Sequence, residues 1–148
     1  SKIASAGQNG QFRTPRHIIK LMVAMMEPTL DDVVCDPSAG SCGFLVTASE
    51  YVREKYPKDL LKTENKKHFE HKMFMGMEFD PTMLRIGAMN MMLHGIEGVQ
   101  LKDVDALSQA NAGFFESCTL VLANPPFKGS LDEDVIYNEL TKTVKTKK

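Results

Sequence analysis

The stretch Val33-Val34-Cys35-Asp36-Pro37-Ser38-Ala39-Gly40-Ser41-Cys42-Gly43 decides the fold class of this chain. Its first three residues are a short apolar run, which is typical of a strand that is buried on both faces. Asp36-Pro37 ends the run, and small residues lead into a helix that is expected over 44–56. A buried strand, a loop of small residues and a helix in this order predict the first half of a βαβ unit.

The same alternation continues along the chain. Apolar runs at 73–77, 99–101 and 118–123 predict three more strands, and 57–67 reads as a polar surface connection. Strands that are separated by helices predict an α/β fold with a parallel sheet that is flanked by helices on both faces.

Three further helices are expected. The first is capped by Thr14 with Pro15 at its first position, presents Ile18, Leu21, Met22 and Met25 on its apolar face, and ends at Pro28. The second spans 81–94, with Leu84, Ala88, Met91 and Met92 at core spacing and Gly95 after its end. The third spans 133–144.

Composition limits the class of protein. The chain has 148 residues, of which 43% are hydrophobic and 25% charged, as in one ordinary globular domain. It has neither an apolar stretch long enough for a membrane helix nor the apolar core of a signal peptide, so a cytoplasmic protein without membrane association is expected. Three cysteines complete neither a disulfide framework nor a zinc pattern, and no metal site is expected.

The net charge of −1 excludes a chain that binds nucleic acid mainly through its overall charge. A role on DNA would therefore need a local basic patch, further segments or partner proteins.

Each predicted strand is followed by a polar residue: Asp36, Glu78, Asp105 and Asn124. In open parallel sheets, ligands bind beyond the carboxyl ends of the strands, so these side chains are expected to line one edge. Glu78 suits the hydroxyls of a ribose, and Asp105 suits an adenine amino group. Taken singly, Glu78 fits a solvated strand end equally well, and a helix cap or turn is the favoured interpretation of Asp105. The loop at 36–43 lacks the GxGxxG spacing of a dinucleotide site.

Asn124-Pro125-Pro126-Phe127 is the most specific element. Two prolines directly after a buried strand fix the backbone and leave carbonyl groups without neighbouring N–H groups. The Asn124 amide supplies another acceptor, and Phe127 supplies a flat stacking surface. This combination suits a planar ring with an exocyclic amino group.

These motifs together resemble the methyltransferase subunit of type I restriction-modification systems, within the N6-adenine DNA methyltransferases. The resemblance runs through Gly10-Gln11-Phe12-Arg13-Thr14-Pro15-Arg16, the 36–45 loop, Gly76-Met77-Glu78, Asn90 to Ile96 and Asn124-Pro125-Pro126-Phe127. It implies a Rossmann-like methyltransferase fold that depends on S-adenosylmethionine, with about four of the seven strands of that fold present in this chain. Residues 1–9 would be a flexible lead-in, and 10–148 part of a catalytic domain.

The resemblance also implies the role of each residue. The methionine part of S-adenosylmethionine would be held by Thr14 and the loop residues Asp36, Ser38, Gly40, Ser41 and Gly43. Glu78 would bind the ribose and Asp105 the adenine of the cofactor. Asn124, Pro125, Pro126 and Phe127 would form the catalytic tetrapeptide. Within it, Asn124 and Pro125 would hold the target amino group, and Phe127 would stack on the target base. DNA and the specificity and restriction subunits of a type I complex would be the partners.

Two departures from the family pattern carry expectations of their own. Cys42 stands where the family usually has glycine, so its side chain is expected to crowd the cofactor. The small number of strands indicates a fragment, which is expected to be inactive in isolation.

Other interpretations of the function remain open. The chain could belong to a protein-glutamine or RNA methyltransferase, or be a module that only binds cofactor or a partner. A nicotinamide dehydrogenase is disfavoured because the GxGxxG motif is missing.

Overall fold

The computed structural model describes residues 13–106 and 117–125. Within them, the element order is α1 (Arg16–Met26), β1 (Val34–Asp36), α2 (Gly43–Lys55), the 3-10 turn η2 (Asp59–Leu61), α3 (Thr63–His71), β2 (Phe74–Met77), α4 (Pro81–Leu93), β3 (Gln100–Lys102) and β4 (Leu120–Val121). The alternation confirms the predicted α/β class. The helix predicted at 133–144 lies outside the described residues.

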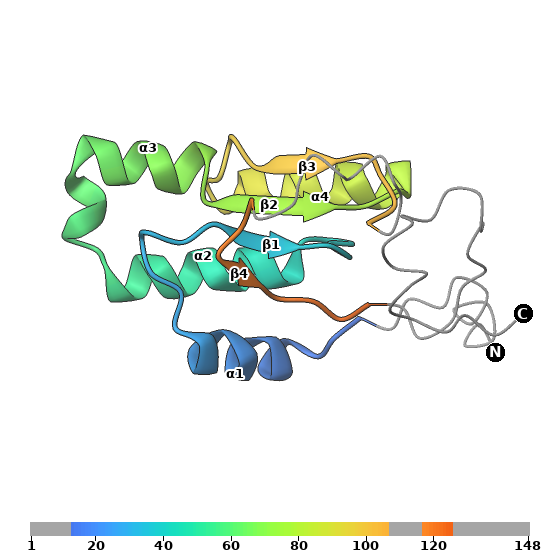
Figure 1. The fold of residues 1–148 in the computed structure, drawn as a ribbon, viewed down its shortest axis with the longest axis horizontal. Helices are drawn as coiled ribbons and strands as arrows, with labels where there is room; N and C mark the ends of the chain where they lie inside the picture. The colour runs from blue at the N-terminus through green and yellow to red at the C-terminus, as the bar shows by residue number, and fades with distance from the viewer. Residues whose placement is uncertain (1–12, 107–116, 126–148) are drawn as a thin grey trace, which may run out of the picture.

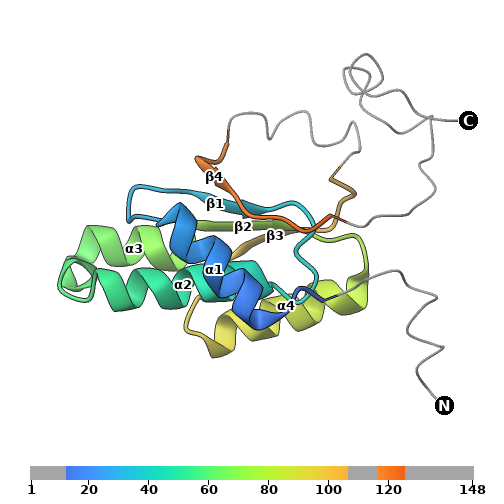
Figure 2. The same cartoon turned by 90° about the horizontal axis from the view of Figure 1, so that it is seen from below.

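The four strands form one sheet in the order β3-β2-β1-β4, and every neighbouring pair is parallel. Asp36 pairs with Gly76, and Met77 pairs with Lys102, so the carboxyl ends of β1, β2 and β3 lie side by side. Their arrowheads point the same way in Figure 1. Figure 2 shows α1, α2 and α4 on one side of the sheet, and no helix of the described residues covers the opposite face, where the sequence predicted a second layer.

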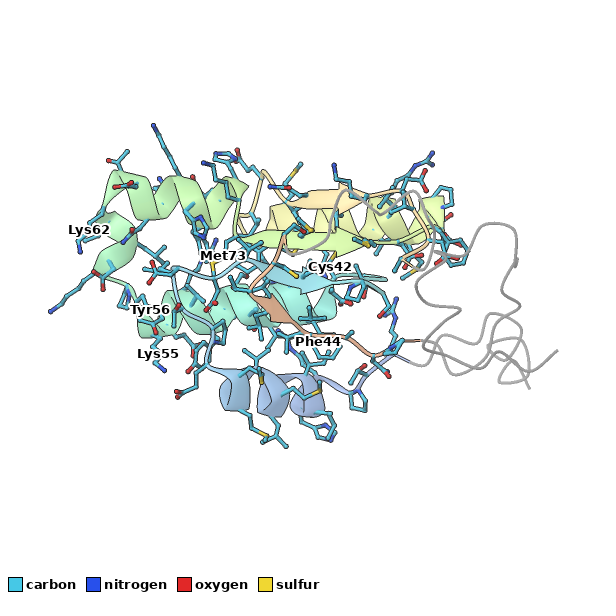
Figure 3. The ribbon with its side chains drawn as sticks, in the orientation of Figure 1. Cys42, Phe44, Lys55, Tyr56, Lys62 and Met73 are labelled. Carbon is cyan, nitrogen blue, oxygen red and sulfur yellow. The ribbon has the colours of Figure 1, made fainter. Side chains whose placement is uncertain are left out.

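The core lies between the sheet and these helices. Val34 and Phe74 of the central strands are buried, as are Leu45, Ala48 and Val52 of α2. Figure 3 shows Cys42 and Phe44 where α2 begins and Lys55 and Tyr56 where it ends. The helix expected over 44–56 is therefore confirmed, and its first turn is directed toward the carboxyl end of β1.

Two predicted helix faces are partly wrong. On α1, Ile19 and Val23 are buried, whereas Ile18, Leu21 and Met25 are exposed. On α4, Met91 is buried as expected, but Met92 is 62% exposed. Both helices carry more apolar residues than one face can hold, so their spacing does not distinguish the buried stripe from its neighbour.

The segment predicted as a polar connection at 57–67 contains η2 and the first part of α3 instead. Phe69 is the one residue of α3 that is buried. Its ring packs edge-to-face on Phe74 with 5.4 Å between centroids, and the Arg53 guanidinium lies 5.1 Å from its centroid. A helix that is held by a single apolar side chain has no periodic pattern to reveal it.

Strand β4 is shorter than the predicted 118–123 run. Only Leu120 and Val121 have strand geometry, and among the described residues they pair with β1 alone. The segment still follows β1 beyond the strand, because the Leu122 N–H donates to the Cys35 carbonyl at 2.9 Å. This contact carries the chain on to Asn124 at the same edge of the sheet.

We expect Gly76→Ala to lower the free energy of unfolding by roughly 1–3 kcal/mol, the usual range for overpacking a core. A Cβ at Gly76 would lie 2.9 Å from the Ala39 Cβ and 2.8 Å from Leu101 Cδ2, so the loop after β1 would have to move. Urea denaturation followed by circular dichroism measures the difference.

Gly43→Ala is the matched control. A Cβ there meets only the tip of the Ile19 side chain, at 3.3 Å, and alanine favours the helix that begins at this residue. Its unfolding free energy is expected to stay within about 1 kcal/mol of the wild-type value. Equal midpoints for Gly76→Ala and the wild type would contradict this account of the packing.

Candidate functional site

A cavity of about 670 Å³ opens at the carboxyl ends of the strands. Its volume lies within the usual range for small-molecule sites. Every predicted site residue within the described ranges lines it: Thr14, Asp36, Ser38, Gly40, Ser41, Gly43, Glu78, Asp105, Asn124 and Pro125. Pro126 and Phe127 lie outside the described residues. The structure thus brings together side chains from the ends of four strands and from the start of α1.

Glu78 holds the loop that follows β1. One of its carboxylate oxygens accepts the Gly40 N–H at 3.0 Å, and the other accepts the Asp80 N–H at 2.9 Å. The Ala39 N–H also donates to the Met77 carbonyl at 2.9 Å. Glu78 is 6% exposed, so these are charge-assisted hydrogen bonds in a partly dry environment. The carboxylate predicted to bind a ligand therefore also shapes the loop beside it.

Asp36 is the most deeply buried acid at this edge, with 1% of its surface exposed. One of its oxygens accepts the Ser38 N–H at 3.0 Å and the Ser38 hydroxyl at 3.4 Å. The described residues offer its second oxygen no hydrogen bond. Burial raises the pKa of Asp36 to about 6; the Ser38 hydrogen bonds oppose this rise, and the nearby Glu78 carboxylate adds to it. A buried oxygen without a donor, in the wall of a cavity, suits a cationic ligand group.

Cys42 does not crowd the cavity, which corrects the expectation from its position. Its backbone is left-handed, with φ 61°, and its side chain is fully buried in the core rather than lining the cavity. Gly87 of α4 accommodates it, because a Cβ at Gly87 would lie 2.7 Å from the Cys42 sulfur and 2.9 Å from the Gly40 carbonyl oxygen. Burial raises the pKa of the Cys42 thiol to about 12, and the charges of Asp36 and Glu78 add to the shift.

Asn90 is a cavity residue whose role the sequence did not reveal. Its side-chain NH2 donates to the Ser41 carbonyl at 2.8 Å, and so joins α4 to the loop after β1. The Asn90 carbonyl lies 2.8 Å from Nδ1 of His94, whose Nε2 lies 3.6 Å from Glu50. Glu50 in turn pairs with Arg16 at 3.0 Å. One feature of the sequence could have indicated this role. Asparagine has a low helix propensity, so its presence inside a Met-rich apolar helix indicates a specific contact.

Thr14 is not the helix cap that the sequence predicted. Helix α1 begins at Arg16, with Pro15 as the cap residue and no side-chain capping bond. The Thr14 hydroxyl instead accepts a hydrogen bond from the Asn124 NH2 group at 2.9 Å. Two predicted site residues 110 positions apart are thereby in direct contact.

Pro125 and Asp105 are exposed where they line the cavity. Within residues 13–106 and 117–125, no group of three histidine, cysteine or acidic residues is arranged to hold a metal ion. The helices of the same ranges are all too short or too polar to cross a bilayer.

Residues 2–147 match the family described as N-6 DNA methylase. The chain is 32% identical over 137 residues to the methylase subunit of the type I restriction enzyme EcoEI from Escherichia coli, an alignment that covers 92% of this chain and 27% of that protein.

Two solved structures are similar in fold and sequence. The crystal structure of the M protein of the type I restriction enzyme EcoKI has a TM-score of 0.73 and 30% identity, covering 83% of this chain and 26% of that one. A structure concerned with complex assembly and conformational transition of the type I restriction-modification system has a TM-score of 0.72 and 31% identity, covering 84% and 25%. The chain thus spans about a quarter of the length of these relatives.

We expect Asp36→Asn to stabilise the ligand-free protein at pH 8. Because the folded-state pKa of about 6 lies above the ordinary value of 3.8, the folded protein binds this proton more tightly than the unfolded chain does. Stability is therefore lost as pH rises from about 4 to 6, by up to about 3 kcal/mol. Asparagine removes the charge but keeps an acceptor for Ser38.

Urea denaturation at pH 8 and pH 4 measures the effect. The gain in unfolding free energy is expected to be roughly 1–3 kcal/mol at pH 8 and markedly smaller at pH 4. Asp31→Asn, at an exposed acid, is the control and is expected to change the unfolding free energy by less than about 0.5 kcal/mol. An equal shift for Asp36→Asn at both pH values would refute the assigned burial of its charge.

Proposed function

The chain belongs to the N-6 DNA methylase family, and from this membership and the contents of the cavity we propose the activity of the whole protein. It is a type I restriction-modification methylase subunit that transfers a methyl group from S-adenosylmethionine to N6 of adenine in DNA. The observation that carries the proposal is the convergence of Asp36, Glu78, Asp105 and Asn124 on one cavity.

The cavity suits S-adenosylmethionine in charge. The Asp36 oxygen that accepts no hydrogen bond from the described residues suits the ammonium group of the methionine part, with Ser38, Gly40, Ser41 and Gly43 beside it. Each Glu78 oxygen accepts one N–H group and keeps a second acceptor position, which serves the ribose hydroxyls. Asp105 faces the cofactor adenine in this assignment. The chemistry that the bound cofactor supplies is a methyl group activated by its sulfonium sulfur.

Asn124 and Pro125 act on the methyl acceptor. The lone pair of an aromatic amine is delocalised into its ring, which makes the amine a poor nucleophile. Two acceptors, the Asn124 side-chain oxygen and the Pro125 carbonyl, bind its N–H groups and localise the lone pair. Holding the amine in line with the methyl group supplies much of the acceleration, which reaches roughly 7–11 kcal/mol in favourable cases.

An adenine inside a duplex cannot reach this edge of the sheet, so the base is flipped out. Phe127 then stacks on the flipped base, which is worth about 1–3 kcal/mol.

Arg13 and Arg16 line the same cavity and supply local positive charge in a chain whose net charge is −1. One similar structure concerns complex assembly of the type I restriction-modification system, which supports a subunit that works in an assembly, and specificity and restriction subunits are the partners that we propose. Cytoplasmic location and inactivity of this chain in isolation stay predictions.

We expect Asn124→Ala in the full-length protein, assembled with its specificity subunit, to lower methyl transfer to DNA by at least about 10²-fold. The substitution removes an acceptor for the target amine, while the acids that hold the cofactor stay in place. The dissociation constant of S-adenosylmethionine, measured by calorimetry, is expected to stay within about threefold of the wild-type value.

Met89→Ala, at an exposed position of α4, is the control and is expected to transfer methyl groups normally. The substrates are duplex DNA, single-stranded RNA and a glutamine-containing peptide. Retained turnover of Asn124→Ala on DNA would contradict the role of Asn124. Transfer by the wild type to RNA or peptide but not to DNA would overturn the substrate assignment.

A further inference from the structure

The contact between Thr14 and Asn124 has a specific geometry. The Asn124 NH2 group donates to the Thr14 hydroxyl oxygen at 2.9 Å, and both residues are half-buried in the cavity wall. The described residues give the Asn124 side chain no other hydrogen bond. Because α1 begins after Pro15 without a side-chain cap, the Thr14 hydroxyl serves Asn124 rather than the helix.

A carboxamide presents an oxygen acceptor on one side and an NH2 donor on the other. The terminal torsion of asparagine is broad and roughly two-fold, so a freely rotating side chain would present either group to a ligand. An NH2 group that faces the amino group of adenine sets donor against donor. Only the orientation in which the oxygen faces the adenine amine supports the proposed chemistry.

The backbone already restricts Asn124. The residue before a proline is confined to extended conformations, and Pro125 and Pro126 follow. The side-chain torsions are then the remaining freedom of this amide. In the structure the Thr14 hydroxyl accepts from the Asn124 NH2 group, and this hydrogen bond holds the side chain in the orientation that leaves its oxygen as the acceptor for a ligand.

We propose that Thr14 is a positioning residue for the methyl-transfer step, which orients the Asn124 carboxamide so that its oxygen accepts from the target amine. This inference rests on the proposed function and adds to it, because family resemblance assigns Thr14 to the cofactor alone. A positioning role acts on turnover at saturation, whereas a role confined to cofactor binding acts on affinity. The two roles are therefore separable by experiment.

The experiment compares Thr14→Val and Thr14→Ser in the full-length protein assembled with its specificity subunit. Valine keeps the shape of threonine and removes the hydroxyl, whereas serine keeps the hydroxyl. At saturating DNA and S-adenosylmethionine, kcat of Thr14→Val is expected to fall about 10- to 100-fold, the scale of a misplaced catalytic group. Thr14→Ser is expected to recover most of kcat, and the dissociation constant of S-adenosylmethionine to stay within about threefold for both.

Thr82→Val is the matched control, because it removes a hydroxyl on the exposed first turn of α4, outside the cavity. Its kcat is expected to equal that of the wild type. Melting temperatures of all variants verify folding. Should Thr14→Val be unstable, Thr14→Ala replaces it in the comparison with Thr14→Ser.

Two results would overturn the inference: full kcat in Thr14→Val, or a loss that is confined to cofactor affinity and vanishes at saturation. An equal fall of kcat in Thr14→Ser and Thr14→Val would also overturn it, because the hydroxyl would not be the cause. A wild-type assembly that transfers no methyl group to adenine would instead refute the proposed function, and the inference would fall with it.

Discussion

The two hydrogen bonds accepted by the Glu78 carboxylate are the constraint on which this edge of the molecule depends. They join the Gly40 N–H, in the loop after β1, to the Asp80 N–H, at the start of α4. Hydrogen bonds to a charged group contribute about 1.5–3 kcal/mol each, more than those between neutral groups. Because β1 and β2 are parallel neighbours in register, one acid at the end of β2 can reach both segments. Glu78 therefore both fixes the segments that form the cavity wall and lines the cavity itself.

Close packing at two glycines also fixes the loop after β1. Gly76 allows Ala39 to approach β2, and Gly87 allows Cys42 and the Gly40 carbonyl to approach α4. Asn90 adds a hydrogen bond from α4 to Ser41. The loop is thus held from two sides before any ligand binds, which lowers the entropy that binding must overcome. Asp36, by contrast, is a buried acid that forms no ion pair with any described residue, as is typical of residues held for binding rather than for stability.

The sequence predicts which residues line the cavity better than it predicts which helix faces are exposed. Strand ends at Asp36, Glu78 and Asn124 follow from apolar runs that stop at polar residues, and a parallel sheet brings them to one edge. Helix α3 escaped prediction because Phe69 is its only buried residue. The buried stripe of α1 was misplaced because two adjacent stripes are apolar. Spacing and composition do not encode which of two similar faces meets a neighbour.

Contacts between distant segments were equally out of reach, since nothing local in the sequence links Thr14 to Asn124 or Asn90 to Ser41. The most direct test of the site as a whole is a crystal structure of the full-length protein with S-adenosylhomocysteine. The ligand's ammonium group is expected to lie at Asp36 and its ribose at Glu78, with Gly40 in the loop at 38–43 still hydrogen-bonded to Glu78. Density for the ligand away from both acids, or a loop that has left Glu78, would contradict it.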